Sequence, residues 1–473
     1  MNFKKTVAIA TAVGALAAVS VPAFALENEF HGMYRLRGMM SNYTNSGGGA
    51  LHAGTAADPA PTMTVFEQRA RLQYIAKASD DLKLVTHFEI DSSWGDTAYN
   101  NGRGLGGGMA ADTVNLETKN VFLDFNCPLT GANVKAGIQP ISDAYKGTFI
   151  IDDMGGIIAA KKFGAATATA GFFRLQDYGA VTPSATPGVT ANPIGRKNLD
   201  LYLLDGKFAV SKDLTVGGSY YLVNKDDLYN AGYLHMVGAN AAAKFGIITA
   251  DAFLAYQWGD ALDSSKAIST TTGTRDLSAY AAQVAVKADL GAAGAIRANV
   301  LYLTGDNNKD PHNSDAWQSV DSYAGAAAGA KQSSASYYDS KMMLLMRNVV
   351  NMDTDKALVQ FNNNNNRGLT LFTLGYDIKF NDKLAASANV GYAAASKKQG
   401  IGAAADVSAS IGTEVNAQVD YKMFSNLTAS LQLAYVFLGE GMNSTTTTQK
   451  RLPGGVANAD DPYLTALMLN YTF

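Results

Sequence analysis

The sequence predicts an all-β protein whose strands close into a transmembrane antiparallel β-barrel of 18 strands, with 16 as the alternative count. Three observations predict it. Apolar and polar side chains alternate with a period of two along many segments, as expected for strands with one apolar face. Short turns and long connections alternate along the chain. No apolar run long enough for a transmembrane helix follows the first 25 residues.

Residues 1–25 have the pattern of a secretory signal peptide. Two lysines precede an alanine-rich apolar run, and Ala-Phe-Ala at 23–25 supplies a cleavage site. We therefore expect export, with residues 26–473 forming the barrel. Removing the signal peptide changes the formal net charge from −3 to −5, and this mild acidity disfavours nucleic acid as a partner. The single cysteine, Cys127, excludes an internal disulfide.

The first three strands show the alternation most clearly. In the first, Phe30, Tyr34 and Leu36 share one face, and Arg35 and Arg37 share the other. The second and third strands are joined by a tight turn at residues 79–81, and both place apolar side chains outside and charged ones inside. The expected strands over the whole chain are at about residues 29–42, 64–78, 82–94, 115–126, 133–139, 157–163, 165–176, 198–210, 214–224, 232–244, 247–258, 276–288, 294–303, 368–380, 384–394, 407–423, 427–438 and 461–473.

The middle strands are the source of the uncertainty in the count. The fourth to eighth expected strands, between residues 115 and 210, are the least certain, so a barrel of 16 strands stays possible. The longest connection, 304–367, is polar and is expected to be an external loop. It contains one apolar piece, Met342–Met346, which we interpret as a possible short helix without a defined place.

The last strand carries the strongest single signal. From Tyr463 onward, every second side chain is Tyr, Thr, Leu, Leu, Tyr and finally Phe473. A soluble edge strand with this aromatic surface would aggregate, whereas a lipid-facing strand of a closed barrel would not. The stretch resembles the C-terminal strand of bacterial outer-membrane β-barrels, which end in an aromatic residue. An even number of strands also returns the C-terminus to the periplasmic side, where all tight turns would lie.

A barrel of 16 or 18 strands leaves a water-filled interior, so the inward residues decide what passes. Arg35, Arg37, Arg69 and Arg71 are expected to form a basic patch on one wall. The alternative is that Glu67, Glu89 and Asp91 neutralise them, which would leave the arginines without a filtering role.

Residues 140–156 follow the fifth strand and contain Asp143, Asp152 and Asp153. Here the chain resembles porins, in which the loop after the fifth strand folds into the barrel and opposes acidic groups to a basic wall. The resemblance implies a constriction loop with these three aspartates on its acidic side. This assignment rests on the position of the loop after the fifth strand, because the sequence of the general-porin constriction is not reproduced here. The alternative is an ordinary glycine-rich turn with solvated aspartates.

The plan of the whole mature chain resembles porins, and in particular channel proteins of anaerobic, metal-reducing bacteria. The resemblance implies a homotrimer in outer-membrane lipid and lipopolysaccharide, passing small hydrophilic solutes and ions by passive diffusion. The histidines lack metal-ligand spacing and no haem motif is present, so we expect no metal, cofactor or enzymatic activity.

Three other functions stay open from the sequence. The first is a substrate-selective channel for sugars or organic acids. The second is a barrel sheath around an exported electron-transfer cytochrome. The third is an outer-membrane hydrolase that uses His312 and Ser314.

Overall fold

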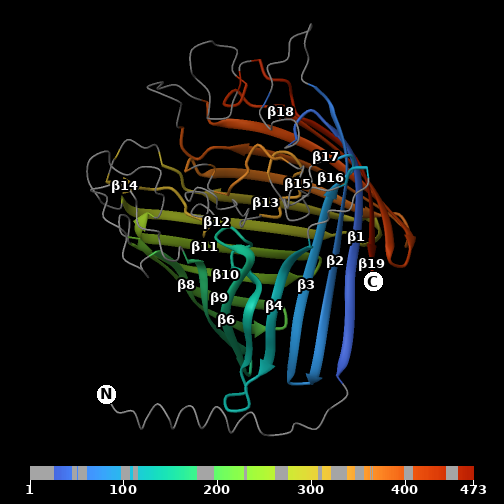
Figure 1. The fold of residues 1–473 in the computed structure, drawn as a ribbon. Helices are drawn as coiled ribbons and strands as arrows, with labels where there is room; N and C mark the ends of the chain where they lie inside the picture. Colours follow the sequence, from blue (N-terminus) through green and yellow to red (C-terminus); the bar gives the residue numbers. More distant parts are fainter. Residues whose placement is uncertain are drawn as a thin grey trace, which may run out of the picture.

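In the computed structural model, the strands of the chain form one continuous sheet that closes on itself (Figure 1). The expected signal peptide lies outside the described residues. Among these residues, no helix is long and apolar enough to cross a membrane. The structure describes residues 26–44, 51, 61–96, 107–109, 116–177, 197–227, 232–261, 275–306, 310, 312–320, 338–346, 356–362, 364, 366–398, 408–443, 456 and 458–473.

Eighteen of the strands in this sheet form the barrel wall, which confirms the expected fold class and the higher of the two counts. A further strand, β14 (Asn313–Ser314), pairs in parallel with the extracellular end of β12. The wall strands are β1 (Glu27–Ser41), β2 (Met63–Ser79), β3 (Leu82–Ser93), β4 (Leu116–Asn126), β5 (Asn133–Ser142), β6 (Ile151–Phe163), β7 (Ala166–Asp177), β8 (Lys197–Ser211), β9 (Leu214–Asp227), β10 (Gly232–Phe245), β11 (Ile248–Ala261), β12 (Arg275–Asp289), β13 (Ala295–Leu303), β15 (Leu369–Lys379), β16 (Leu384–Ala394), β17 (Ser410–Phe424), β18 (Leu427–Leu438) and β19 (Tyr463–Thr472).

The first and last strands close the barrel. Strand β1 pairs antiparallel with β2 on one side and β19 on the other, and Figure 1 shows blue β1 beside red β19. The backbone of Phe473 exchanges two hydrogen bonds with Gly32, of 2.9 and 3.0 Å. A Cβ atom on Gly32 would lie 2.4 Å from Cζ of Phe473, so the glycine leaves the space that the terminal ring occupies.

The period-two pattern sorts the side chains as expected. Outward residues are exposed, for example Phe30 at 59%, Tyr233 at 54% and Phe437 at 54%, whereas the inward Arg37 is 5% exposed. Because every wall strand has two hydrogen-bonded neighbours, the wall has no free edge. A closed sheet with an apolar exterior satisfies its backbone inside a bilayer.

Short turns gather at one end of the barrel and long connections at the other. The turns between β6 and β7 and between β10 and β11 use Gly164 and Gly246, which have φ of 59° and 60°. A side chain at either position would be strained in this left-handed conformation. The alternation of turn lengths thus fixes which strand ends face the periplasm and which face outward.

Two expected elements differ in the structure. Strand β6 begins at Ile151 rather than near residue 157, and β5 ends at Ser142, so the connection expected at 140–156 shortens to residues 143–150. Residues 342–346 are not helical; Met346 instead forms an isolated bridge with Val359. Parts of the long connection are enclosed rather than projecting outward: Trp317 and Met342 are fully buried.

Candidate channel constriction

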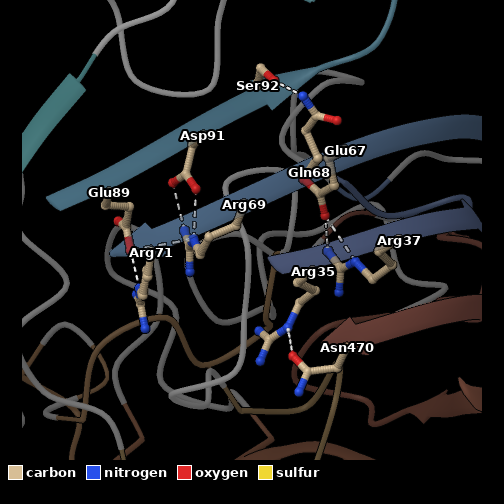
Figure 2. A network of polar contacts seen from close by, with 10 residues as sticks. All are labelled: Arg35, Arg37, Glu67, Gln68, Arg69, Arg71, Glu89, Asp91, Ser92 and Asn470. Carbon is tan, nitrogen blue, oxygen red and sulfur yellow. Dashed lines mark hydrogen bonds and ion pairs between the residues drawn. The ribbon is translucent and has the colours of Figure 1, made fainter. Parts of the chain in front are cut away.

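The four arginines expected on one wall lie on the inner faces of β1 and β2, and three of them have carboxylate partners (Figure 2). Arg37 Nε donates to Glu67 Oε1 at 2.9 Å, and Arg71 pairs with Glu89. These partners stand directly opposite one another in the strand register. The period of two places both members of each pair on the inner face, and the strand register places them opposite one another.

Arg69 forms a bidentate ion pair with its carboxylate partner. Its Nε and Nη2 donate to the two Asp91 oxygens at 2.6 and 2.7 Å, which is a bidentate pair. Arg69 and Asp91 are each 4% exposed. A buried, paired guanidinium offers little field to a passing solute, because its partner cancels most of its charge.

Arg35 differs from the other three. It lies half-buried between Arg69 and the last strand, and its Nε donates to the neutral Asn470 amide oxygen at 3.4 Å. It also lines a cavity of about 410 Å³ in the lumen. Arg35 therefore contacts a neutral amide and also lines an open cavity.

The connection 143–150 is folded around Asp143. The Asp143 carboxylate accepts hydrogen bonds of 2.7–2.8 Å from the backbone N–H groups of Tyr145, Gly147, Phe149 and Ile150. Burial raises the pKa of the Asp143 carboxyl to about 6, and the four N–H donors oppose this rise by favouring the charged form. Asp143 is 8% exposed and acts as the centre of the loop rather than as a group facing water.

The same connection lies against the inner faces of β9, β10 and β11. The Tyr145 ring packs edge-on against Tyr221 and Phe253, at centroid distances of 6.1 and 5.4 Å. Lys146 forms an ion pair with Asp251 on β11. Gly238 makes room for this approach, because a Cβ atom there would lie 2.5 Å from the Tyr145 hydroxyl.

The other two expected aspartates belong to β6. Asp153 pairs with Lys119 on β4 at 2.6 Å and also accepts from the Asn120 amide at 2.7 Å. Asp152 accepts the backbone N–H of Asp153. Among the described residues, no ion pair joins Asp143 or Asp153 to the four arginines. An acidic side of the constriction opposite a basic wall stays a prediction.

The sequence did not indicate that described parts of the connection between β13 and β15 also lie in the lumen. Its described parts bind the connection 143–150: Trp317 Nε1 donates to Thr148 O at 3.0 Å, and Asn362 Nδ2 donates to Gly147 O at 2.9 Å. We call residues 143–150, 312–320, 338–346 and 356–362 together the plug. The apolar run Met342–Met346 in a polar connection was the one signal that could have revealed it.

Glu414 on the inner face of β17 anchors the plug to the wall. Its carboxylate accepts the backbone N–H groups of Met343, Leu344 and Leu345, at 2.7, 3.0 and 2.6 Å. Glu414 is 0% exposed. Gly391 on β16 receives Met342, because a Cβ atom there would lie 2.4 Å from the methionine sulfur.

A cavity of about 790 Å³ lies beside the plug, and another of about 410 Å³ is lined by residues of the wall and its turns. Their lining carries more basic than acidic residues, in a chain whose formal net charge is −3. The basic residues are Arg35, Arg37, Lys287, Arg297, Lys341, Lys379, Lys383 and Lys422. The acidic residues are Asp289, Asp339, Asp377, Asp382 and Asp420.

Comparison with known proteins supports the fold. No family model matches the chain, and neither does any curated protein. The solved structure of the outer membrane protein OccK1 (OpdK) of Pseudomonas aeruginosa is similar, with a TM-score of 0.51, 11% identity, and coverage of 94% of this chain and 98% of that one. OccAB4 of Acinetobacter baumannii has a TM-score of 0.51, 12% identity and the same coverage.

Identities this low show a shared fold. The closed wall and the exposed apolar exterior are those of a transmembrane β-barrel of the bacterial outer membrane, and the chain shares this fold with the solved structures.

Proposed function

We propose that the chain forms an outer-membrane channel that passes small organic anions in preference to other solutes. The observation that carries the proposal is a lumen narrowed by the plug and lined by excess basic side chains. A ring of cationic side chains around a narrow aqueous path favours anions. The remaining cavity of about 790 Å³ has the size of a small-molecule site.

A structural neighbour agrees with this charge. OpdK of Pseudomonas aeruginosa, with a TM-score of 0.50 and 11% identity, was crystallised with vanillate, which is a carboxylate anion. The agreement supports the proposed class of solute.

Non-selective passive diffusion is the function expected from the sequence, and it is the main alternative to an anion-selective channel. A barrel of this strand number without a plug would be a wide aqueous pore, but the plug contacts fill part of the lumen. A sheath for a cytochrome is disfavoured for the same reason, since the cavity beside the plug is of small-molecule size. The homotrimer and the contact with lipopolysaccharide that the resemblance implies remain part of the proposal.

Planar bilayer recording tests the proposal directly. The purified protein is reconstituted, and the reversal potential is measured across a KCl gradient. We expect chloride to be favoured over potassium, and we expect small carboxylates such as benzoate to reduce the chloride current. A neutral sugar of similar size serves as the control. Equal permeability to both ions, with no effect of benzoate, would support the diffusion pore instead.

A further inference from the structure

The inner wall from β16 to β19 and β1 carries three rows of polar side chains between the plug anchor and the periplasmic end. On β17 the inward residues that follow Glu414 and Asn416 are Gln418, Asp420 and Lys422. The strand register places polar residues of the neighbouring strands beside each of these three, so each row crosses the wall. We call these rows the wall patch. The first row is Ser387, Gln418 and Gln432, the second is Asp420 and Ser430, and the third is Lys422, Thr428, Asn470 and Arg35.

The first two rows are hydrogen-bonded to each other and keep acceptors in reserve. Gln432 Nε2 donates to Gln418 Oε1, and Gln418 Nε2 donates to Asp420 Oδ1, both at 2.8 Å. The Ser430 hydroxyl donates to the same Asp420 oxygen at 2.5 Å. Asp420 Oδ2 and Gln432 Oε1 accept no hydrogen bond from the described part of the chain. Carboxylate and amide oxygens accept from hydroxyl groups, and each glutamine amide has a second N–H to donate, so these rows suit a solute with several hydroxyl groups.

The third row supplies positive charge. Lys422 and Arg35 belong to it, and Lys383 adjoins it, because the Lys422 backbone N–H donates to Lys383 O at 2.7 Å. All three cations line the smaller cavity. Figure 2 shows Arg35 directed at Asn470 of the same row. Among the described residues, no carboxylate forms an ion pair with Lys383 or Lys422.

The positive charge of the third row is not cancelled within the smaller cavity. The lining has four basic residues and two acidic ones, which leaves an excess of two positive charges. Lys379 pairs with Asp382 at 3.2 Å. The other acidic residue is Asp420, which faces the three remaining cations. A solute carboxylate therefore meets a net positive field here.

The two kinds of row meet where the two cavities adjoin. Asp420 lines both cavities, whereas Gln418 and Gln432 line the larger one and Lys422 the smaller. Inward residues two positions apart on a strand are separated by about 7 Å, which a six-carbon solute can span. Among the described residues, no aromatic side chain lines either cavity, so the lining offers no ring on which an aromatic carboxylate would stack.

We propose that the wall patch is a binding subsite for carboxylates that carry several hydroxyl groups, the chemical class of sugar acids. The carboxylate lies beside the cations of the third row. The hydroxyl groups hydrogen-bond to Asp420, Gln418 and Gln432. Asp420 supplies the selectivity, because its charge repels a plain anion but accepts hydrogen bonds from a hydroxylated one. The inference rests on the proposed anion channel and names the class of anion that it takes.

Block of the chloride current in planar bilayers tests the subsite. Gluconate and hexanoate, which have the same charge and the same number of carbon atoms, are titrated separately at constant ionic strength. We expect gluconate to block saturably at concentrations on the order of tenfold below those of hexanoate, because hydrogen bonds to a charged acceptor and to amides contribute at least this factor. Equal block by the two solutes would overturn the inference, even in a channel that prefers chloride to potassium. No preference for chloride would instead count against the proposed channel function.

Two further solutes separate the groups that are recognised. Glucose has the hydroxyl groups without the carboxylate and should block more weakly than gluconate. The zwitterion 6-aminohexanoate presents an ammonium group to Asp420 and should also block more weakly. Block by glucose as strong as that by gluconate would show that the third row takes no part, and stronger block by 6-aminohexanoate would show a site for zwitterions; either result would overturn the inference.

Variants of the wall patch assign the roles. Asp420→Leu removes the acceptor and keeps the cations, so the ratio of the blocking concentrations of hexanoate and gluconate should fall toward one. Gln418→Leu should lower the same ratio without a change of charge. An unchanged ratio in both variants would overturn the assignment of the hydroxyl groups. Heat-modifiable gel mobility confirms that each variant is folded.

A pair of lysine variants locates the carboxylate. Lys422→Gln should weaken the block by gluconate and by hexanoate and keep their ratio. Lys287→Gln is the matched control, because it removes a lysine that lines the larger cavity outside the wall patch, and it should weaken the block much less. Equal losses in the two variants would overturn the third row as the place where the carboxylate binds.

Discussion

At the scale of single residues, the four lumen arginines are not equivalent. Arg69 is buried in a bidentate pair with Asp91, whereas Arg35 lines open space beside the neutral Asn470 amide. A charge reversal at Arg35 therefore changes the field that a solute meets. A charge reversal at Arg69 places a third carboxylate beside Asp91 and Glu89 and acts mainly on stability, because an unpaired buried charge costs several kcal/mol.

We expect Arg35→Glu to move the reversal potential toward cations while the barrel folds normally. Arg69→Glu should lower the yield of folded barrel, measured by heat-modifiable mobility, and shift selectivity less in the fraction that folds. Arg35→Gln, which removes the charge without reversing it, should give about half the shift. A selectivity shift that is the same for both reversals would mean that the ion pair does not mask Arg69.

A second prediction at the residue scale concerns Asp143. Asp143→Ala removes the acceptor of four buried backbone N–H groups, each worth about 1–3 kcal/mol when left unsatisfied. The connection 143–150 should lose its fold while the wall stays closed, so the open-channel current should rise and become noisier. Asp152→Ala, on β6 outside this connection, is the matched control and should leave the current noise unchanged. An unchanged noise spectrum in Asp143→Ala would show that the connection is held by its wall contacts alone.

At the scale of elements, the position of the plug depends on glycines in the wall. Gly238 on β10 sits under the Tyr145 ring, and a Cβ atom there would lie 2.6 Å from its Cζ and 2.9 Å from Leu254 O. Gly238→Val should therefore push Tyr145 away from β10 and increase conductance. Gly218→Ala on the adjacent β9 is the control, because its Cβ would meet no atom closer than 3.8 Å. Equal conductance in the Gly238 variant and the wild type would mean that the ring has another stable position.

The wall strands were predictable because their signal is local. Each strand repeats its pattern every two residues, so the alternation of Phe30, Tyr34 and Leu36 with Arg35 and Arg37 was sufficient to assign both faces of β1. The start of β6 was missed because its first residues contain two aspartates and two glycines, which favour turns. In the structure Gly156 is instead a strand position where Phe173 packs against the backbone.

The plug was not predictable in the same way. Glu414 holds residues about 70 positions earlier in the chain, and it follows the strand alternation like any other inward residue. The residues that contact Glu414 and the wall glycines beneath the plug do not recur at a fixed spacing, so the sequence carries no periodic signal for them. The four arginines and Asp143 were identified as residues of the lumen, but their partners, which decide what they do, are set by register and by long-range contacts.

At the scale of the whole molecule, the wall and the plug are held by different interactions. The wall is one ladder of backbone hydrogen bonds, whereas the plug is tied to it by side chains such as Glu414 and Lys146 and by the short backbone pairing of β14 with β12. Strand β13 pairs directly with β15, from Ala295–Asp377 to Leu303–Leu369, without help from the chain between them. We therefore expect the barrel to stay closed when the connection is removed.

We expect a variant in which residues 307–366 are replaced by a short Gly-Ser linker to fold and to conduct. Because Leu303 and Leu369 are opposite one another, a linker of about six residues spans the gap with ease. With this part of the plug gone, conductance should rise several-fold toward that of a wide aqueous pore, and the preference for anions should fall, since ions would pass farther from the basic side chains than a Debye length of roughly 8–10 Å at these salt concentrations. A variant that folds but keeps the wild-type conductance would show that residues 143–150 alone set the constriction, and one that fails to fold would show that the wall needs the plug as a template.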